Sequence, residues 1–308
     1  MRDKRFLRAS LLVLLTLTLS AASASAQNRL KVMTWNIGGG PCHARVADMR
    51  PFAEEMRAKN PDVIALQEVH YDQAYALAHY MQPAKPFYLQ FVWAQRCVSK
   101  TRPSIFDYGN AIISRFPIRA EGGTFDGGFE VSPDPARAAN GNPEYIKVAE
   151  ASVQLPNGQW VRVYSAHLTG NNGPPANASL QASQTLTHIL INDQRSYGQP
   201  RTILMGDFNT YPATGPCATS KAGYTQYRQL THWWWDSPQF TDAWTMKPYD
   251  PGDVCGYTIS PRNVPNPYAR YDYIFLRNTG GFKVNRMERV KTRQRLSDHF
   301  PVYAELSF

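Results

Sequence analysis

The sequence predicts an α/β fold in which two mixed β-sheets pack against each other and helices cover the outside. Strand-like segments rich in β-branched and aromatic residues recur along the whole chain, and fewer helical patterns lie between them. No low-complexity tract or long disordered linker divides the chain. Mixed strands with interspersed helices are typical of packed sheets with outer helices, and 308 residues suffice for one large domain of this kind.

The expected strands include continuous apolar runs as well as alternating patterns, as for strands covered on one or both faces. They are Leu30–Trp35, Val63–Leu66, Phe87–Trp93, Asn110–Ser114, Ile146–Gln154, Val161–His167, Thr202–Met205, Tyr271–Leu276 and Val302–Leu306. The expected helices are Val46–Lys59, Asp72–Met81 and Leu180–Asn192. Glu121–Asn142 and Ser260–Tyr268 are rich in Gly, Pro, Asp or Asn and are expected to be long loops.

Residues 1–26 have the pattern of a secretory signal peptide. The basic stretch Arg2–Arg8 precedes a short apolar run, Leu11–Leu19, and Ala22–Ala26 offers small-residue cleavage sites. The run is too short for a spanning helix, although an uncleaved anchor is the alternative. We therefore expect cleavage after Ala26, a mature catalytic domain over residues 27–308, and a secreted or periplasmic protein without a transmembrane segment.

The four cysteines all lie in the part of the chain expected to be exported. An even count in an oxidising compartment favours two disulfides, and none of the spacings is the CxxC of a structural zinc site. Of the three pairings that four cysteines allow, we favour Cys42–Cys97 and Cys217–Cys255, because each joins neighbouring loops within one half of the chain.

Polar residues that can bind a metal or move a proton follow the ends of several expected strands. They are Asn36, Glu68, His167, Asp207, Asn209, Asp298 and His299. Glu68 and Asp298 are carboxylates and Asn36 offers an amide oxygen, so these three are the candidate ligands of Mg²⁺ or Mn²⁺ rather than zinc. Such a set suits metal-assisted cleavage of a phosphoester.

The two histidines are candidates for proton transfer. His299 needs a carboxylate to orient its imidazole, and Asp272 is the natural partner. His167 can donate to a phosphate oxygen, Asp207 can bind the attacking water or a metal, and Asn209 can hold a phosphate oxygen. Each alone also has a structural interpretation, such as an Asx turn after a strand.

Together, six short motifs resemble the endonuclease/exonuclease/phosphatase superfamily, the group of DNase I, exonuclease III-like endonucleases, neutral sphingomyelinases and inositol polyphosphate 5-phosphatases. The motifs are Met33-Thr-Trp-Asn36, Gln67-Glu68, Tyr108–Arg115, Ser165-Ala-His167-Leu, Gly206-Asp207-Phe208-Asn209 and Ser297-Asp298-His299. The resemblance covers roughly residues 29–308. It implies a DNase I-like, four-layered α/β sandwich and metal-dependent phosphoester hydrolysis.

The resemblance also implies roles for the catalytic residues. His299 would be a general base or acid paired with Asp272, and His167 would contact the transition state. Asp207 and Asn209 would position the nucleophile and the phosphate.

The substrate is left open by these motifs. The chain carries a net charge of +9, and the basic segment Lys283–Arg295 leads into the Asp298-His299 loop. These features favour nucleic acid as the substrate of a secreted nuclease, although a solvated hairpin would have the same composition. We expect the protein to be a monomer. One alternative is a sphingomyelinase-like phospholipase acting on phospholipid head groups, since Trp233–Trp235 could stack on bases or enter a lipid surface. Another is a catalytically silent exported binding protein.

Overall fold

Two β-sheets and the helices on them make up the part of the chain that the computed structural model describes. The described residues are 28–38, 48–82, 85–93, 108–120, 127–134, 144–169, 175–195, 201–212, 217, 225–231, 239–247, 253–259, 269–277 and 281–308. The expected signal peptide, the Cys42–Cys97 pair, Trp233–Trp235 and the Ser260–Tyr268 loop lie outside them. Within the described residues, no helix has the length and apolar character needed to cross a membrane.

Both sheets are mixed and follow the same plan. The first contains, in spatial order, β12 (Lys283–Arg289), β13 (Val302–Ser307), β1 (Arg29–Asn36), β2 (Val63–His70), β4 (Tyr108–Ser114) and β3 (Tyr88–Trp93). The second contains β10 (Phe240–Asp242), β11 (Asp272–Arg277), β9 (Arg201–Asp207), β8 (Trp160–His167), β7 (Glu144–Gln154) and β5 (Ile118–Ala120), and β6 (Gly128–Asp134) also pairs with β7. Each sheet has one central parallel pair, β1–β2 or β8–β9, flanked by antiparallel strands.

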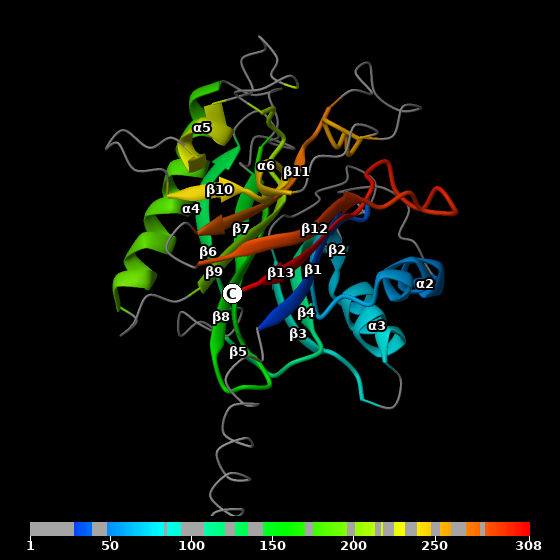
Figure 1. The fold of residues 1–308 in the computed structure, drawn as a ribbon. Coiled ribbons are helices and arrows are strands. Elements are labelled where there is room, and N and C mark those ends of the chain that lie inside the picture. Colours follow the sequence, from blue (N-terminus) through cyan, green and yellow to red (C-terminus); the bar gives the residue numbers. More distant parts are fainter. Residues whose placement is uncertain are drawn as a thin grey trace, which may run out of the picture.

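Helices cover the outer face of each sheet, as Figure 1 shows. The first sheet carries α2 (Arg50–Lys59) and α3 (Tyr71–Met81); the second carries α4 (Pro175–Arg195) and α5 (Thr225–Thr231), and the short α6 (Ala243–Met246) follows β10. One hydrophobic core lies between the sheets, and one lies between each sheet and its helices. The architecture is therefore the predicted four-layered α/β sandwich.

The apolar run of β1 shows why both of its faces are buried. Leu30 and Val32 point into the core between the sheets, whereas Met33 and Trp35 point into the core under α2 and α3. Successive side chains of a strand face opposite sides, so a strand with a core on each side needs apolar residues at consecutive positions. Burying each such side chain contributes about 1.5–3 kcal/mol.

Some predicted boundaries were wrong. The Glu121–Asn142 segment is not a loop throughout, because β6 lies within it and pairs with β7. The glycine content of the segment suggested a loop, but Gly128 has another role. A Cβ there would lie 2.4 Å from the carbonyl oxygen of Val148, so this glycine permits close strand packing rather than a turn. The helix predicted over Leu180–Asn192 is longer, and β5, β10, β12, α5 and α6 were not predicted.

One of the two predicted disulfides lies within the described residues. Cys217 and Cys255 are bonded, with their Cα atoms 5.4 Å apart. This pairing confirms the prediction for the second half of the chain. The bond joins the loop that follows β9 to the segment that precedes β11.

Candidate active site

Strand register places three of the predicted residues side by side at one end of the second sheet. His167 of β8 is paired with Asp207 of the parallel strand β9, and Asp207 is paired with Asp272 of the antiparallel strand β11. All three side chains are buried, with exposed fractions of 6%, 1% and 0%. Three adjacent strands thus fix a histidine and two carboxylates next to one another.

Gly206 makes this arrangement possible. Its φ is +147°, and a Cβ at this position would lie 1.9 Å from the carbonyl oxygen of Ala166 in β8. The obstacle is backbone rather than a flexible side chain, so no other residue fits without moving a strand. The glycine before Asp207 therefore sets the close approach of β8 and β9.

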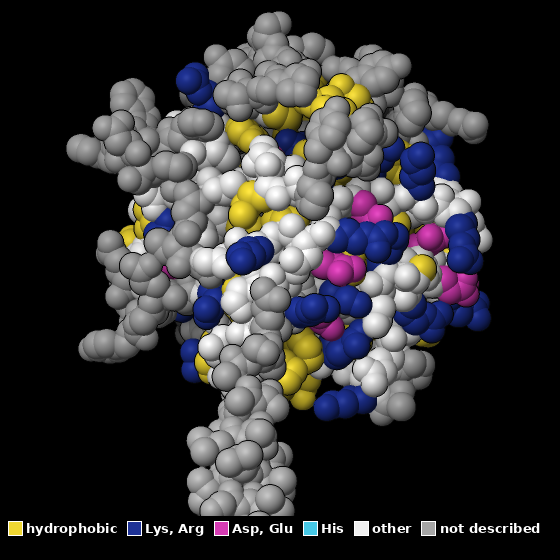
Figure 2. Space-filling model, viewed as in Figure 1, with side chains coloured by type: hydrophobic (Ala, Val, Ile, Leu, Met, Phe, Trp, Pro, Cys, Tyr) yellow, Lys and Arg dark blue, Asp and Glu magenta, His cyan; other side chains and the backbone are white. Residues whose placement is uncertain are grey.

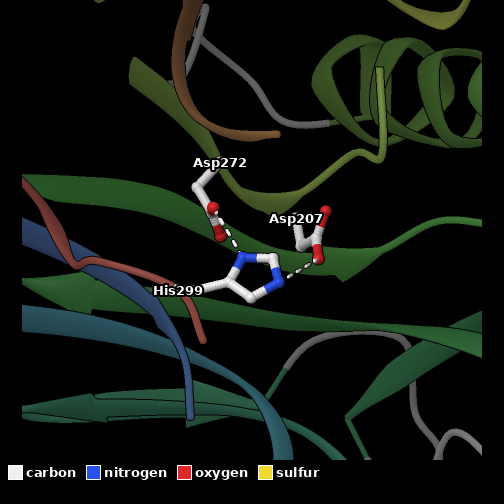
Figure 3. Close-up of side chains that lie close together, drawn as sticks. All are labelled: Asp207, Asp272 and His299. Carbon is white, nitrogen blue, oxygen red and sulfur yellow. Dashed lines mark hydrogen bonds and ion pairs between the residues drawn. The ribbon is translucent and has the colours of Figure 1, made fainter. Parts of the chain in front are cut away.

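His299 reaches this group from the segment that precedes β13 in the first sheet. Its Nδ1 donates to Asp272 Oδ2 over 2.8 Å, and its Nε2 lies 3.7 Å from Asp207 Oδ2 (Figure 3). Burial by itself lowers the pKa of His299, but the negative charges of Asp272 and Asp207 outweigh it and raise this pKa to about 10. The imidazole therefore lies between two carboxylates, and their negative charges favour its charged form.

Asp207 Oδ2 is the central atom of the site. Asn36 Nδ2 donates to it over 3.0 Å, and His167 Nε2 lies 3.6 Å away. Burial raises the pKa of Asp207, and the positive charge of His299 opposes this rise. Asn209 completes the turn after β9: its N–H donates to Asp207 Oδ1 over 2.9 Å and its Nδ2 donates to the carbonyl oxygen of Leu168 over 2.9 Å.

Glu68 enters the site through an irregularity in β2. The register shifts between Leu66, which pairs with Ala111, and Val69, which pairs with Gly109, so β2 has one extra residue there. Glu68 itself has a φ of +53°, a left-handed conformation that costs a non-glycine residue about 1–2 kcal/mol. The bulge points its carboxylate at the site, where Oε1 accepts from Asn36 Nδ2 over 3.2 Å.

Ser297 links the segment that carries Asp298 and His299 to Asn36. The carbonyl oxygen of Asn36 accepts from Ser297 Oγ over 2.8 Å, and Asn36 Oδ1 accepts from the N–H of Gly38 over 3.0 Å. Asp298 Oδ1 lies 3.2 Å from the position that a Cβ on Gly38 would take. Ser297 Oγ also accepts from the N–H of His299 over 3.0 Å. The eight predicted site residues therefore lie at one end of the sandwich.

The donor set fits a divalent cation. Glu68 Oε1, the amide oxygen of Asn36 and the carboxylate of Asp298 are hard ligands of the kind that Mg²⁺ or Mn²⁺ prefers. Glu68 and Asp298 are partly accessible, whereas Asn36 is buried. A second group, Asp207, Asp272 and His299, has ligand atoms within 4.8 Å of one another. In that group the imidazole already shares its Nδ1 proton with Asp272, an arrangement that suits proton transfer.

Residues beneath the site had no predicted role. Gln67 Nε2 donates to Ser165 Oγ over 3.0 Å, and Ser165 Oγ donates to the carbonyl oxygen of Leu66, so these fully buried side chains connect the two sheets. Trp35 Nε1 donates to the carbonyl oxygen of His299 over 3.0 Å. A polar residue inside an apolar strand, as at Gln67 and Ser165, is the signal that could have identified the first pair.

Comparison with known proteins gives a family match and several structural relatives. A model of the Endonuclease/Exonuclease/phosphatase family matches residues 33–299. No curated protein sequence matches the chain. The chain is similar in fold to an endonuclease/exonuclease/phosphatase from Beutenbergia cavernae DSM 12333, with 24% identity, a TM-score of 0.65, and 91% of this chain and 72% of that chain covered.

Two further structures are similar in fold. One is the human nocturnin catalytic domain with bound sulfate anion, with 15% identity, a TM-score of 0.61, and 92% of this chain and 97% of that chain covered. The other is D. rerio TDP2 complexed with single-strand DNA product, with 18% identity, a TM-score of 0.55, and 91% and 100% covered. Since the family match contains the site residues from Asn36 to His299, the chain belongs to the endonuclease/exonuclease/phosphatase family of metal-dependent phosphoric ester hydrolases.

Proposed function

We propose that this protein is an exported phosphodiesterase that uses Mg²⁺ or Mn²⁺ to cleave nucleic acid. The observation that carries the proposal is the position of Asp207 Oδ2, which lies 3.0 Å from Asn36 Nδ2, 3.6 Å from His167 Nε2 and 3.7 Å from His299 Nε2. The proton-transfer groups therefore surround one carboxylate that also contacts Asn36, a candidate cation ligand, and hydrolysis of a phosphodiester uses both kinds of group.

Each side chain has a proposed task. Asn36, Glu68 and Asp298 would hold the cation, which would polarise the phosphate and stabilise negative charge on its oxygens. Asp207 and Asn209 orient the attacking water and the phosphate. His167 donates to a phosphate oxygen, and His299 moves a proton at Nε2 while Asp272 holds its Nδ1. All of these side chains belong to one chain, so none of the tasks requires a group from another protein.

Nucleic acid is the favoured substrate because of the charge beside the site. Lys291, Arg293 and Arg295 are exposed on the segment that leads into Asp298 and His299. Figure 2 shows Lys and Arg side chains spread over the face that carries β12 and β13, with fewer acidic side chains among them. Exposed cations along the approach to a phosphodiester site suit a phosphate backbone. The fold relative TDP2 was solved with a single-strand DNA product, which agrees with this proposal.

Export is the second part of the proposal. The signal-peptide pattern of residues 1–26 supports it, and so does the Cys217–Cys255 disulfide, because such bonds persist mainly in oxidising compartments. N-terminal sequencing of the protein from culture medium or periplasm should find Gln27 as the first residue. An intact N-terminus on a cytoplasmic protein would contradict export.

A phospholipase is the second candidate, and exposed tyrosines favour it. Tyr71 and Tyr75 on α3, which begins soon after Glu68, are 48% and 51% exposed, and their rings stack on each other. Aromatic side chains of this kind also occur where a protein meets a lipid surface. The silent-binder alternative is less favoured, because none of the eight site residues is missing.

One assay panel separates these candidates. The purified protein, with Mg²⁺ or with a chelator, is incubated with plasmid DNA, RNA, sphingomyelin vesicles and bis(4-nitrophenyl) phosphate. We expect cation-dependent cleavage of nucleic acid and of the small diester. Cleavage of sphingomyelin alone would favour the phospholipase, and binding without cleavage in every case would favour the silent protein. The His299→Ala variant, purified in parallel, controls for contaminating nucleases.

The basic segment provides a sharper test of the substrate. Replacing Arg293 and Arg295 with Gln should weaken DNA binding and flatten its dependence on salt by up to about 0.9 log units for each phosphate that the protein no longer neutralises. The matched control replaces Lys283 and Arg119 with Gln. Both lie at the ends of their sheets remote from the site, so the salt dependence of DNA binding should stay unchanged. Arg289 is not replaced in this test, because it donates to the carbonyl oxygen of Tyr257 and its loss would also disturb the fold. Equal slopes for both double variants would exclude the segment from the binding site.

A further inference from the structure

A short stretch of chain, the bridging segment Asp253–Ile259, contacts the backbone beside both residues of the catalytic His–Asp pair. Asp272 belongs to the second sheet, and His299 precedes a strand of the first sheet. We propose that Thr258 is a positioning residue that holds Asp272 and His299 in register across the two sheets. The inference rests on the roles proposed above for these two residues.

Thr258 fixes the start of β11 through its hydroxyl oxygen. Thr258 Oγ1 accepts from the N–H of Tyr271 over 3.0 Å and from the N–H of Asp272 over 3.3 Å. Both Thr258 and Asp272 are fully buried, so water does not replace these bonds. A buried N–H left without an acceptor costs about 1–3 kcal/mol. The backbone that carries the Asp272 carboxylate is therefore tied to Thr258.

The same residue fixes the chain around His299 through its backbone. The carbonyl oxygen of Thr258 accepts from the N–H of Phe300 over 2.7 Å, and Ile259 forms an isolated antiparallel bridge with His299. The N–H of Thr258 donates to the carbonyl oxygen of Ala269. Thr258 thus contacts the backbone on both sides of the 2.8 Å bond between Asp272 and His299.

The bridging segment is itself anchored from several directions. The Cys217–Cys255 disulfide ties it to the loop after β9. Trp244 Nε1 donates to the carbonyl oxygen of Val254 over 3.0 Å, and Arg289 Nη1 donates to that of Tyr257 over 3.0 Å. Anchors on β12, α6 and the loop after β9 make the segment a fixed reference for both sheets.

Such a reference matters because the bond between Asp272 and His299 crosses from one sheet to the other. Within the described residues, β11 and β13 belong to different sheets and share no ladder of backbone hydrogen bonds. The bridging segment is therefore a hydrogen-bonded link next to the pair itself, in addition to packing and to the bonds between the sheets at Gln67 and Asn36. A displacement of about 1 Å in a catalytic group can cost on the order of 100-fold in rate. Losing the Thr258 hydroxyl should therefore lower turnover more than substrate binding.

The test compares Thr258→Val, which keeps the shape of the side chain, with Thr258→Ser, which keeps the hydroxyl. We expect Thr258→Val to lower kcat for bis(4-nitrophenyl) phosphate by about 10- to 100-fold with little change in KM, and Thr258→Ser to restore most of it. The matched control is Thr185→Val. Thr185 is also fully buried, but its hydroxyl donates to the carbonyl oxygen of Gln181 within α4. That variant should lower Tm and leave kcat unchanged.

Wild-type kcat in Thr258→Val would overturn the inference, and so would equal losses in the Val and Ser variants. If Thr258→Val does not fold, Thr258→Ala takes its place, and equal kcat for the Ala and Ser variants overturns the inference. His299→Ala and Asp272→Asn are measured in the same assay. Full activity in those two variants would refute the catalytic roles proposed for His299 and Asp272. If they are inactive while Thr258→Val stays fully active, only the positioning role of Thr258 is refuted.

Discussion

The two sheets meet at one site, but each contributes a different kind of side chain in a different way. On the second sheet, His167, Asp207 and Asp272 occupy paired positions on adjacent strands and are almost completely buried. On the first sheet, Glu68 reaches the site through a bulge in left-handed conformation, and its side chain stays 19% exposed. The residues of the second sheet are thus fixed and shielded from solvent, whereas Glu68 of the first sheet is more accessible.

This difference matches the chemistry expected of each side. Proton transfer depends on fixed hydrogen bonds, and these are stronger where water is excluded. A Mg²⁺ ion keeps several water ligands and needs only a few protein oxygens, so part of its site must remain open to solvent, as it does at Glu68 and Asp298. The strained backbone of Glu68 supports the same interpretation, because strain of this kind tends to occur at functional sites.

The largest expected effect comes from the buried group around Asp207, to which the first sheet contributes His299. His299→Ala removes the group between Asp207 and Asp272 and should lower kcat by about 10²- to 10⁴-fold, the usual contribution of a general acid or base. Binding of Mg²⁺, measured by calorimetry, should persist, because the candidate ligands Asn36 and Glu68 are unchanged. A kcat close to that of the wild type would show that this buried group does not carry the proton transfer.

The next effect concerns the backbone on which Asp207 lies. Gly206→Ala places a Cβ 1.9 Å from the carbonyl oxygen of Ala166, so β8 and β9 would have to separate. We expect a loss of at least about 3 kcal/mol in the free energy of unfolding, measured by urea denaturation. Glu68→Asn is the counterpart on the first sheet, and it should be tolerated, because Asn adopts left-handed conformations readily. Similar losses of unfolding free energy in Gly206→Ala and Glu68→Asn would show that the two sheets do not differ in how tightly they fix their site residues.

The smallest expected effect on the fold comes from Glu68→Gln. The variant should raise the Mg²⁺ concentration for half-maximal activity by at least about 10- to 100-fold, since it loses a charged ligand. Its free energy of unfolding should stay within about 0.5 kcal/mol of the wild type. Asp272→Asn, in the buried group, should instead cost about 1–3 kcal/mol. A normal metal titration for Glu68→Gln would contradict the assignment of the cation to the first sheet.

Much of the fold and the composition of the site could be predicted from local patterns. Apolar runs such as Val63–Leu66 predict buried strands, because side-chain alternation is a property of the backbone alone. Polar residues directly after such runs predicted the site, because the ends of central strands converge in a packed sandwich. Asp272 was identified as the partner of His299 for a chemical reason, and the two side chains are 2.8 Å apart.

Other features depend on contacts between distant parts of the chain. Nothing near Thr258 in the sequence indicates that it contacts the backbone on both sides of the His–Asp bond, and nothing near Arg289 distinguishes it from the exposed Arg293. The bulge at Glu68 likewise appears only when β2 pairs with β4. The sequence by itself determined most of the strands, the fold class and the chemical character of the site, because these follow from local periodicity and side-chain chemistry. Only the tertiary structure decided which groups are fixed and which stay accessible, because register and packing between sheets are set by the whole chain.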